Sequence, residues 1–271
     1  MMIRRRRDNG ALVLRAYCGA VLLFLSLPIV VAIGVAFGQS KIARFPPTGL
    51  SLRWFAVALS DATFVNALIN SLQLAIATTI LAVGFALPGA IALVRHRFPA
   101  QAGLEAALLS PLSLPGVLFG VSMLFFFGAI DVGLSWWGLL VAHVVISVPY
   151  VLSATLAVYR GLDRGLEEAA TVLGATPWQT FRHVTLPLLR PGLAAGALFA
   201  FLTSFDNVPV SIFLTTARNN TLPVTIMSYL VSQDFDAVIG AISTLEVGFV
   251  LVLLWALNRF YGVGRVTSFG A

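Results

Sequence analysis

A short polar segment in an otherwise apolar chain reads GLEEAATVLGATPWQTFRHVTLPLLRP over residues 165–191. Its first part predicts a helix over 166–173, because Glu167 and Glu168 occupy the first turn, where the helix dipole favours negative charge. Gly174 predicts the end of this helix, since glycine adopts the left-handed cap conformation without a steric penalty. The segment therefore opens with a short helix that stops at a defined residue.

A second short helix is predicted directly after the first. Thr176 is a preferred N-cap residue, and Pro177 suits the first helical position. Leu186 and Pro187 predict the end of this helix, and Pro191 predicts the start of the next membrane span. We therefore expect a helix–turn–helix on the membrane surface. Its expected apolar face consists of Leu166, Ala169, Ala170 and Leu173.

The composition of the whole chain indicates a membrane protein. Of its 271 residues, 59% are hydrophobic and only 10% are charged, and the mean hydropathy is +0.94. A soluble domain carries roughly 25% charged residues, and one soluble core cannot bury so large an apolar excess. These values exclude an ordinary soluble enzyme, a disordered chain and a nucleic-acid-binding protein. They predict an all-α polytopic membrane protein.

Windows of about 20 apolar residues, bounded by charged or turn residues, predict six transmembrane helices. We place them at residues 16–38, 63–94, 104–130, 136–159, 191–215 and 237–260. No composition shift marks a second domain, so residues 1–271 are expected to form one transmembrane domain, with its core helices within 63–260. The longest external loops are expected at 39–62 and 216–236.

The distribution of positive charges predicts the orientation of these spans. With an even number of spans, both termini lie on one side of the membrane. That side receives 13 of the 17 Lys and Arg residues, namely Arg4, Arg5, Arg6, Arg7, Arg15, Arg95, Arg97, Arg160, Arg164, Arg182, Arg190, Arg259 and Arg265. The other side receives Lys41, Arg44, Arg53 and Arg218. Both termini are therefore expected to be cytoplasmic.

A signal peptide is the alternative interpretation of the start of the chain. The arginines at 4–7 and the apolar residues after them fit its first two regions. The apolar run continues to Phe37, however, and no convincing cleavage site follows. The sequence therefore favours an uncleaved first helix.

The polar segment resembles part of a known family. Glu168, Ala169 and Ala170, with Gly174 six residues after the glutamate and then 186–187, are similar to the EAA loop of binding-protein-dependent ABC importer permeases. An ordinary amphipathic interfacial helix has no need of this glutamate-to-glycine spacing. The six spans, the orientation and the loop position also agree. The resemblance thus implies a type I ABC importer transmembrane domain in the bacterial inner membrane.

The resemblance also implies partners for this chain. In that family the loop is a coupling helix that docks in a groove of the ATP-binding subunit, and residues 165–187 are expected to do the same here. The residues expected to couple the two subunits are Glu167, Glu168, Ala169, Ala170, Leu173, Gly174, Ala175, Pro177 and Phe181. The other expected partners are a second permease subunit, a second ATP-binding subunit, an external substrate-binding protein and membrane lipid.

No cofactor or metal site is expected in this chain. Lys41 is its only lysine, and no glycine-rich loop precedes it, so the sequence lacks a phosphate-binding Walker loop. ATP and Mg²⁺ are therefore expected in the partner subunits, and this chain is expected to be a transport subunit rather than an enzyme. Cys18 is the only cysteine, which excludes a cysteine-cluster metal site.

The third predicted span contains two prolines, Pro111 and Pro115, followed by Gly116. Prolines four residues apart remove two backbone donors and should bend the helix. The bend could be a hinge or gate in the wall of a translocation path, or it could be a static kink. The sequence favours neither alternative.

Polar residues within the predicted spans mark a candidate translocation path. Two are acids, Asp206 in the fifth span and Glu246 in the sixth. Asn207, His143 and Tyr150 complete the candidate set. Structural alternatives remain open: Asp206 could cap the local backbone, Glu246 could be protonated against a partner helix, and His143 could form hydrogen bonds between helices.

The substrate class rests on a further resemblance. Residues 204–207 and 221–223 look like the corresponding segment of spermidine/putrescine-type permeases. The expected substrate is therefore a small cationic, polyamine-like amine. Relatives often carry a second acid where this chain has Asn207, which argues against a strongly dicationic substrate. Related importers take opines, amino-acid derivatives, aminophosphonates or ferric iron, so these stay alternatives.

Two other functional classes fit the sequence less well. An ion-coupled secondary transporter would have no use for the segment at 165–187. A membrane-embedded enzyme would need catalytic side chains clustered at one depth, and the three histidines of this chain do not supply such a cluster.

Overall fold

The structure, a computed structural model, describes residues 9–42, 44–232 and 236–261. These residues form helices and turns, with isolated β-bridges and no strand among them. Their contacts divide them into two units, one drawn from 1–61 and 230–251 and the other from 62–229 and 252–271. The predicted all-helical architecture is confirmed.

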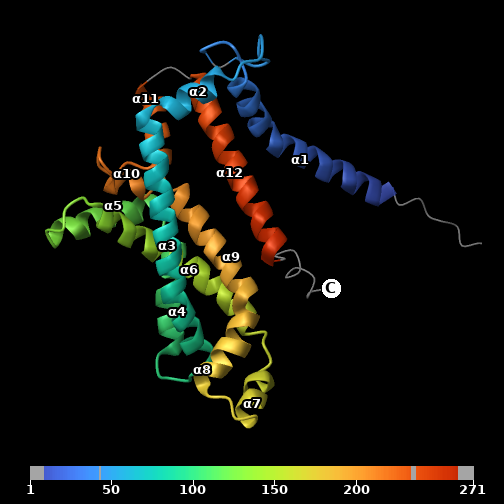
Figure 1. Ribbon diagram of the computed structural model, residues 1–271, viewed down its shortest axis with the longest axis vertical. Coiled ribbons are helices and arrows are strands. Elements are labelled where there is room, and N and C mark those ends of the chain that lie inside the picture. Colours follow the sequence, from blue (N-terminus) through green and yellow to red (C-terminus); the bar gives the residue numbers. More distant parts are fainter. Residues whose placement is uncertain (1–8, 43, 233–235, 262–271) are drawn as a thin grey trace, which may run out of the picture. The chain divides into compact units, whose positions relative to one another are not determined.

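Three helices form the core of the larger unit. They are α3 (Ala62–Arg95), α6 (Trp136–Tyr159) and α9 (Leu186–Phe205), which pack against one another (Figure 1). Glycines allow α6 and α9 to approach closely. A Cβ atom on Gly196 would lie 2.7 Å from the Cα of Val151, and one on Gly192 would lie 2.9 Å from the carbonyl oxygen of Ala154.

Buried side chains fill the space between these helices in two clusters. One, toward the Arg95 end of α3, contains Ala82, Ala86, Ala90, Leu93, Val151, Leu152, Leu156, Tyr159, Leu189 and Ala200. The other contains Leu74, Phe119, Phe127, Leu139, Leu140, Ala142, Val144, Val210 and Leu214. The alanines on α3 keep the helices close, while the larger side chains of α6 fill the gaps between them.

A buried polar network crosses the same core. His143 on α6 is fully buried, and its ring nitrogens lie 2.8 Å from the hydroxyl of Ser204 and 3.0 Å from that of Ser211. The Ser204 hydroxyl donates to Thr78 on α3 at 3.3 Å. Ser204 has one hydroxyl hydrogen, so it must accept from the imidazole, and the other ring nitrogen then accepts from Ser211. The network therefore ties α3, α6, α9 and the short helix α10 (Ser211–Leu214) together.

The third predicted span is broken rather than gently bent. The chain forms α4 (Gln101–Leu109), a 3₁₀ turn (Ser110–Ser113) and α5 (Gly116–Ala129), with an angle of 107° across the break. Pro111 is the second residue of the 3₁₀ turn, and Pro115 is the N-cap residue of α5. The predicted effect of the prolines on the backbone is confirmed. Their role as a gate stays a prediction.

Five helices are long and apolar enough to cross a membrane, and the bent pair raises the possible number of spans to six. The five are Leu12–Ala36, Ala62–Arg95, Trp136–Tyr159, Pro177–Phe205 and Ala237–Ala256. The predicted multi-span membrane architecture therefore holds within the part of the chain that the structure describes.

The predicted boundaries of the fifth span are wrong. We expected Pro187 to end a surface helix and the span to cover 191–215, whereas one helical path runs over Pro177–Phe205. A π turn at Phe181–Thr185 explains this continuity. The Leu186 N–H donates to the carbonyl five residues earlier, and this wider turn accommodates the following proline, which has no N–H to donate.

The smaller unit contains α1 (Asn9–Ala36), α2 (Arg53–Ser60) and the first part of α12 (Ala237–Tyr261). Trp54 on α2 is buried, and its indole N–H donates to the carbonyl of Gly38 at 2.8 Å. A Cβ atom on Gly240 would lie 3.2 Å from the carbonyl oxygen of Ala32, so α12 begins in close contact with α1.

Two segments that we predicted as external loops contain helices instead. Residues 39–62 contain α2, and residues 216–236 contain α11 (Leu222–Ser232). At the start of α11, the Leu222 N–H donates to the hydroxyl of Ser71 on α3 at 2.8 Å. Both helices are shorter than a membrane span and depend on such tertiary contacts.

The orientation of the chain stays a prediction. Arg4, Arg5, Arg6, Arg7 and Arg265, which contributed to it, lie outside the described residues.

His143→Phe should lower the stability of the protein. The substitution replaces the imidazole with a somewhat larger apolar ring and leaves the hydroxyls of Ser204 and Ser211 without their buried partner. Hydrogen bonds between membrane helices contribute about 0.6–1.7 kcal/mol each, so the loss of two should cost about 1–3 kcal/mol. Thermal melting in detergent measures the loss. Tyr150→Phe, a hydroxyl removal on the same helix, serves as the control. Equal melting of His143→Phe and the unsubstituted protein would contradict a structural role for this network.

Candidate functional site

The segment at 165–187 begins with α7 (Gly165–Val172), which ends as predicted. Gly174 has a φ of +88°. Its N–H donates to the carbonyl of Thr171, and the N–H of Ala175 donates to that of Ala170, both at 3.0 Å. These two bonds form the Schellman ending of a helix. Gly174 is therefore needed for its left-handed backbone.

The next helix, α8 (Pro177–Thr180), also begins as predicted. The Gln179 side chain accepts from the Thr176 N–H at 2.8 Å, and the Thr176 hydroxyl accepts from the Gln179 N–H at 3.3 Å. This reciprocal capping box satisfies two N–H groups at the helix start. The direction of the turn between α7 and α8 is thus determined by local hydrogen bonds.

The predicted coupling residues divide into two groups by exposure. Half-buried residues are Glu167, Ala170, Ala175 and Phe181, and exposed residues are Glu168, Ala169, Leu173, Gly174 and Pro177. Of the predicted apolar face of α7, Leu166, Ala169 and Leu173 are exposed, whereas Ala170 is half-buried. Leu173 is 87% exposed. The side of α7 that faces the core helices carries Glu167, whose carboxylate contacts polar groups at the ends of those helices.

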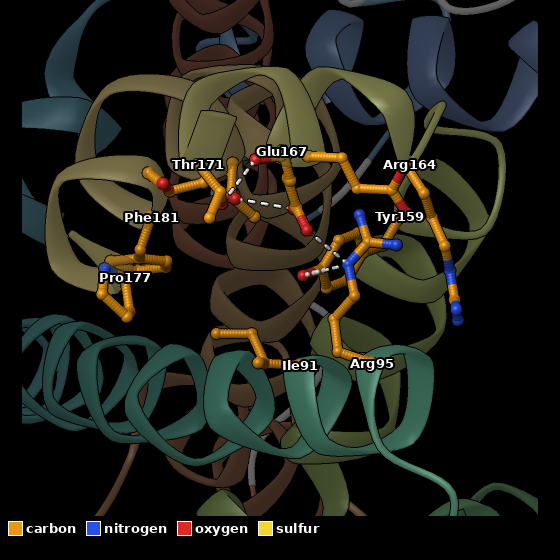
Figure 2. Close-up of a pocket in the computed structure, with 11 residues that line it drawn as sticks. Ile91, Arg95, Tyr159, Arg164, Glu167, Thr171, Pro177 and Phe181 are labelled. Carbon is orange, nitrogen blue, oxygen red and sulfur yellow. Dashed lines mark hydrogen bonds and ion pairs between the residues drawn. The ribbon is translucent and has the colours of Figure 1, made fainter. Parts of the chain in front are cut away.

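Polar contacts connect α7 to the ends of the core helices. Arg95 Nε lies 2.8 Å from Oε2 of Glu167 and 3.1 Å from the hydroxyl of Tyr159. Oε1 of Glu167 accepts from the hydroxyl of Thr185 at 2.7 Å. Arg164, just before α7, donates to the carbonyl of Val94 at 2.7 Å. Figure 2 shows Glu167 pointing toward Arg95, beside a pocket of about 410 Å³.

Sequence reasoning missed the residues that hold α7 in place. Arg95 and Arg164 entered only as charges that indicate orientation, and Tyr159 and Thr185 were not considered. Arg95 and Tyr159 are 64 residues apart in the chain. The sequence offered one indication: Arg95 ends a 34-residue apolar helix, where an arginine near the membrane needs a polar partner.

The acid predicted in the fifth span lies just beyond the helix end. Asp206 is the C-cap residue of α9, and its side chain is exposed. The neighbouring Asn207 carries out the capping that we had considered for the aspartate. Its side chain accepts from the Val210 N–H at 2.9 Å and donates to the carbonyl of Thr203 at 3.2 Å. Among the described residues, no hydrogen bond or ion pair engages the Asp206 carboxylate.

The turn that follows α9 contacts the start of α5. A Cβ atom on Gly116 would lie 3.0 Å from the Cβ of Pro209. One on Gly120 would lie 2.9 Å from the carbonyl oxygen of Pro209 and 3.0 Å from the Cα of Val210. The predicted gate segment therefore packs against the turn that carries Asp206. Gly120 belongs to this contact and was not predicted.

The other predicted path residues occupy different surroundings. His143 is fully buried within the polar network, which favours its structural alternative, and Tyr150 lies on the same helix at the border of exposure. Glu246 is half-buried in α12, within the smaller unit. Its role in a path together with Asp206 stays a prediction.

Most of the chain matches one family. Residues 84–263 match the family described as "Binding-protein-dependent transport system inner membrane component". The chain is 28% identical to the spermidine/putrescine transport system permease protein PotC of Escherichia coli K12, over 91% of this chain and 93% of that one. It is 33% identical to the putrescine transport system permease protein PotI of the same strain, over 86% of each chain.

A solved structure shares the fold. The match is a chain of a bacterial ABC transporter involved in the import of the acidic polysaccharide alginate, with a TM-score of 0.72. It covers 96% of this chain and 99% of that one at 16% sequence identity. The two chains thus share one helical fold over nearly their whole length.

Gly174→Val should loosen the turn between α7 and α8 without unfolding the core. A Cβ atom on Gly174 would have no other atom within 4 Å, so the cost comes from the left-handed backbone, about 1–2 kcal/mol. Hydrogen exchange should become faster over 165–180 and stay unchanged in α6 and α9. Gly161→Val is the control, because Gly161 does not have a positive φ. Equal exchange in both variants would contradict the role of the positive φ.

Proposed function

This chain belongs to the family of binding-protein-dependent transport system inner membrane components, and we therefore propose that it is one permease subunit of an ATP-driven ABC importer for a small cationic, polyamine-like amine. The chain is a multi-pass bacterial inner membrane protein. The observation that carries the transport mechanism is the capped α7–α8 turn with its exposed apolar tip.

The apolar tip is the proposed docking surface for the ATP-binding subunit. Val172 and Leu173 are each 87% exposed, and Trp178 is 65% exposed, although each is apolar. A cluster of exposed apolar side chains on a segment that also carries charge is typical of a protein–protein contact. Leu173 is one of the predicted coupling residues, and the others lie in the same segment at 165–187. We propose that the segment faces the cytoplasm, where ATP is available.

The proposed assembly contains this chain, a second permease subunit, two ATP-binding subunits and an external substrate-binding protein. ATP and Mg²⁺ bind in the ATP-binding subunits, since the sequence of this chain has a single lysine and no Walker loop around it. The family description, which names a binding protein, supports the external partner.

The proposed substrate class is supported by the names of PotC and PotI and by the position of Asp206. This carboxylate is exposed at the C-terminal end of α9 and is held by no ion pair among the described residues. At an effective dielectric of about 20, a unit charge about 4 Å away gains about 4 kcal/mol before desolvation is subtracted. Asp206 would therefore favour a cation over an anion, without selecting one particular amine.

Leu173→Asp should detach the ATP-binding subunit. A charge in an apolar contact loses its hydration without gaining a partner, which costs at least several-fold in affinity. Stoichiometric mass measurement of the complex purified in detergent checks this result. Leu50→Asp is the control, because Leu50 is 78% exposed on a segment expected on the other side of the membrane. Detachment by the control but not by Leu173→Asp would contradict both the docking surface and the orientation.

Asp206→Asn should slow uptake of radiolabelled putrescine by proteoliposomes that contain the complete importer. The neutral isostere removes the attraction for a cation, and a net loss of about 1.4 kcal/mol corresponds to tenfold. Affinity at the binding protein and assembly should not change. Asp131→Asn, on an exposed turn outside the long helices, is the control. Uptake at the normal rate would contradict a role for this charge. Transport of an opine or ferric iron but of no small cationic amine would contradict the substrate class.

A further inference from the structure

Hydrophobic packing contributes little to the position of α7. The helix has eight residues, and none of them is buried. Since the hydrophobic effect scales with the apolar area removed from water, it cannot hold so exposed a helix in one orientation. The polar contacts of Glu167 and Arg164 must therefore supply most of the restraint.

Arg95 is the central residue of these contacts. It is the last residue of α3, and besides its ion pair with Glu167 its guanidinium lies 4.6 Å from the centroid of the Tyr159 ring. A guanidinium over an aromatic face is held by a cation–π attraction as well as by hydrogen bonds. Tyr159 is the last residue of α6 and is itself buried. One side chain therefore bridges α7 to the ends of α3 and α6.

The second oxygen of the Glu167 carboxylate extends the bridge to α9. It accepts from Thr185, the last residue of the π turn that leads into α9. Both carboxylate oxygens are thus engaged, one by Arg95 (Figure 2) and one by Thr185. The three core helices and α7 meet at this single ion pair.

The ion pair is shielded from water more than an ordinary surface pair. The side chains of Arg95 and Glu167 are 15% and 21% exposed. A second pair at the same end of the unit, Arg160 with Glu105, leaves the arginine 53% exposed. Partly buried pairs are screened less by solvent and salt, and removal of one partner leaves a charge without compensation.

We propose that the Arg95–Glu167 ion pair transmits movement of α7 to α3 and, through α3, to the packed core, so that Arg95 and Glu167 are positioning residues for energy coupling. This inference rests on the proposed function of the α7–α8 turn as the docking surface of an ATP-binding subunit. Covalent continuity does not replace the ion pair. Residues 160–164 join α7 to α6, and the helical path over Pro177–Phe205 leads from the turn to α9. α3 has no such direct chain connection to α7 and receives the movement through Arg95.

The test uses the complete importer with three variants of this chain. Arg95→Met keeps the length of the side chain without its charge, Glu167→Gln keeps the shape and an acceptor for Thr185, and the third variant combines both. The measured quantities are the number of bound ATP-binding subunits, the rate of ATP hydrolysis and the amount of solute transported per ATP. Arg160→Met, which removes the more exposed ion pair, is the matched control.

Each single variant should keep its ATP-binding subunits and continue to hydrolyse ATP. The solute transported per ATP should fall roughly tenfold in each, and the double variant should fall no further, since the two residues act as one unit. The control should keep the normal ratio. Arg95→Lys, which retains the charge but lacks the planar guanidinium, should recover part of the ratio.

Several results would overturn this inference. The first is a normal amount of solute transported per ATP in Glu167→Gln. The second is a double variant whose loss is the product of the two single losses. The third is an Arg95→Lys variant that transports no more solute per ATP than Arg95→Met. Loss of the ATP-binding subunits from Glu167→Gln would also overturn it, because the pair would then serve docking rather than transmission. Failure of the proposed function itself would look different: the unsubstituted chain would bind no ATP-binding subunit at all.

Discussion

At Gly196, helix α9 lies so close to α6 that a Cβ atom would be 2.7 Å from the Cα of Val151. The same closeness recurs at Gly192, and alanines on α3 allow the third helix to join them. In a membrane, where lipid offers apolar groups as good a surrounding as protein does, such backbone contact and dispersion contribute much of the association. The close packing brings the three helix ends together, and the polar contacts of Arg95, Tyr159 and Thr185 depend on it.

Two adjacent glutamates on α7 have different surroundings. Glu167 turns toward the core helices and binds Arg95, while Glu168 is exposed. Side chains of consecutive residues on a helix point about 100° apart, so one can serve an internal anchor while the next remains available to a partner. The proposed coupling segment thus has an inner polar face and an outer apolar tip, formed by Val172, Leu173 and Trp178.

The irregular backbone of the larger unit is concentrated where two helices are interrupted. The prolines around 111–115 break the third segment, and α9 ends at Asp206, where Asn207 caps the turn. Gly116 and Gly120 bring these interruptions into contact. Backbone groups freed from helices need partners when no water is near, and here side chains such as Asn207 provide them.

Local patterns predicted much of the fold and of the candidate site. The membrane class, the span at 136–159, the cap at Gly174, the N-cap at Thr176 and the bend at 111–115 follow from neighbours within a few residues, because composition, caps and prolines act locally. The continuation of the helix past Pro187, the short helix α11 and the capping role of Asn207 could not be predicted in this way. Only the tertiary structure decided that Arg95 meets Glu167 and that His143 meets Ser204. Those pairs lie far apart in the chain, and their distances follow from how closely α3, α6 and α9 pack.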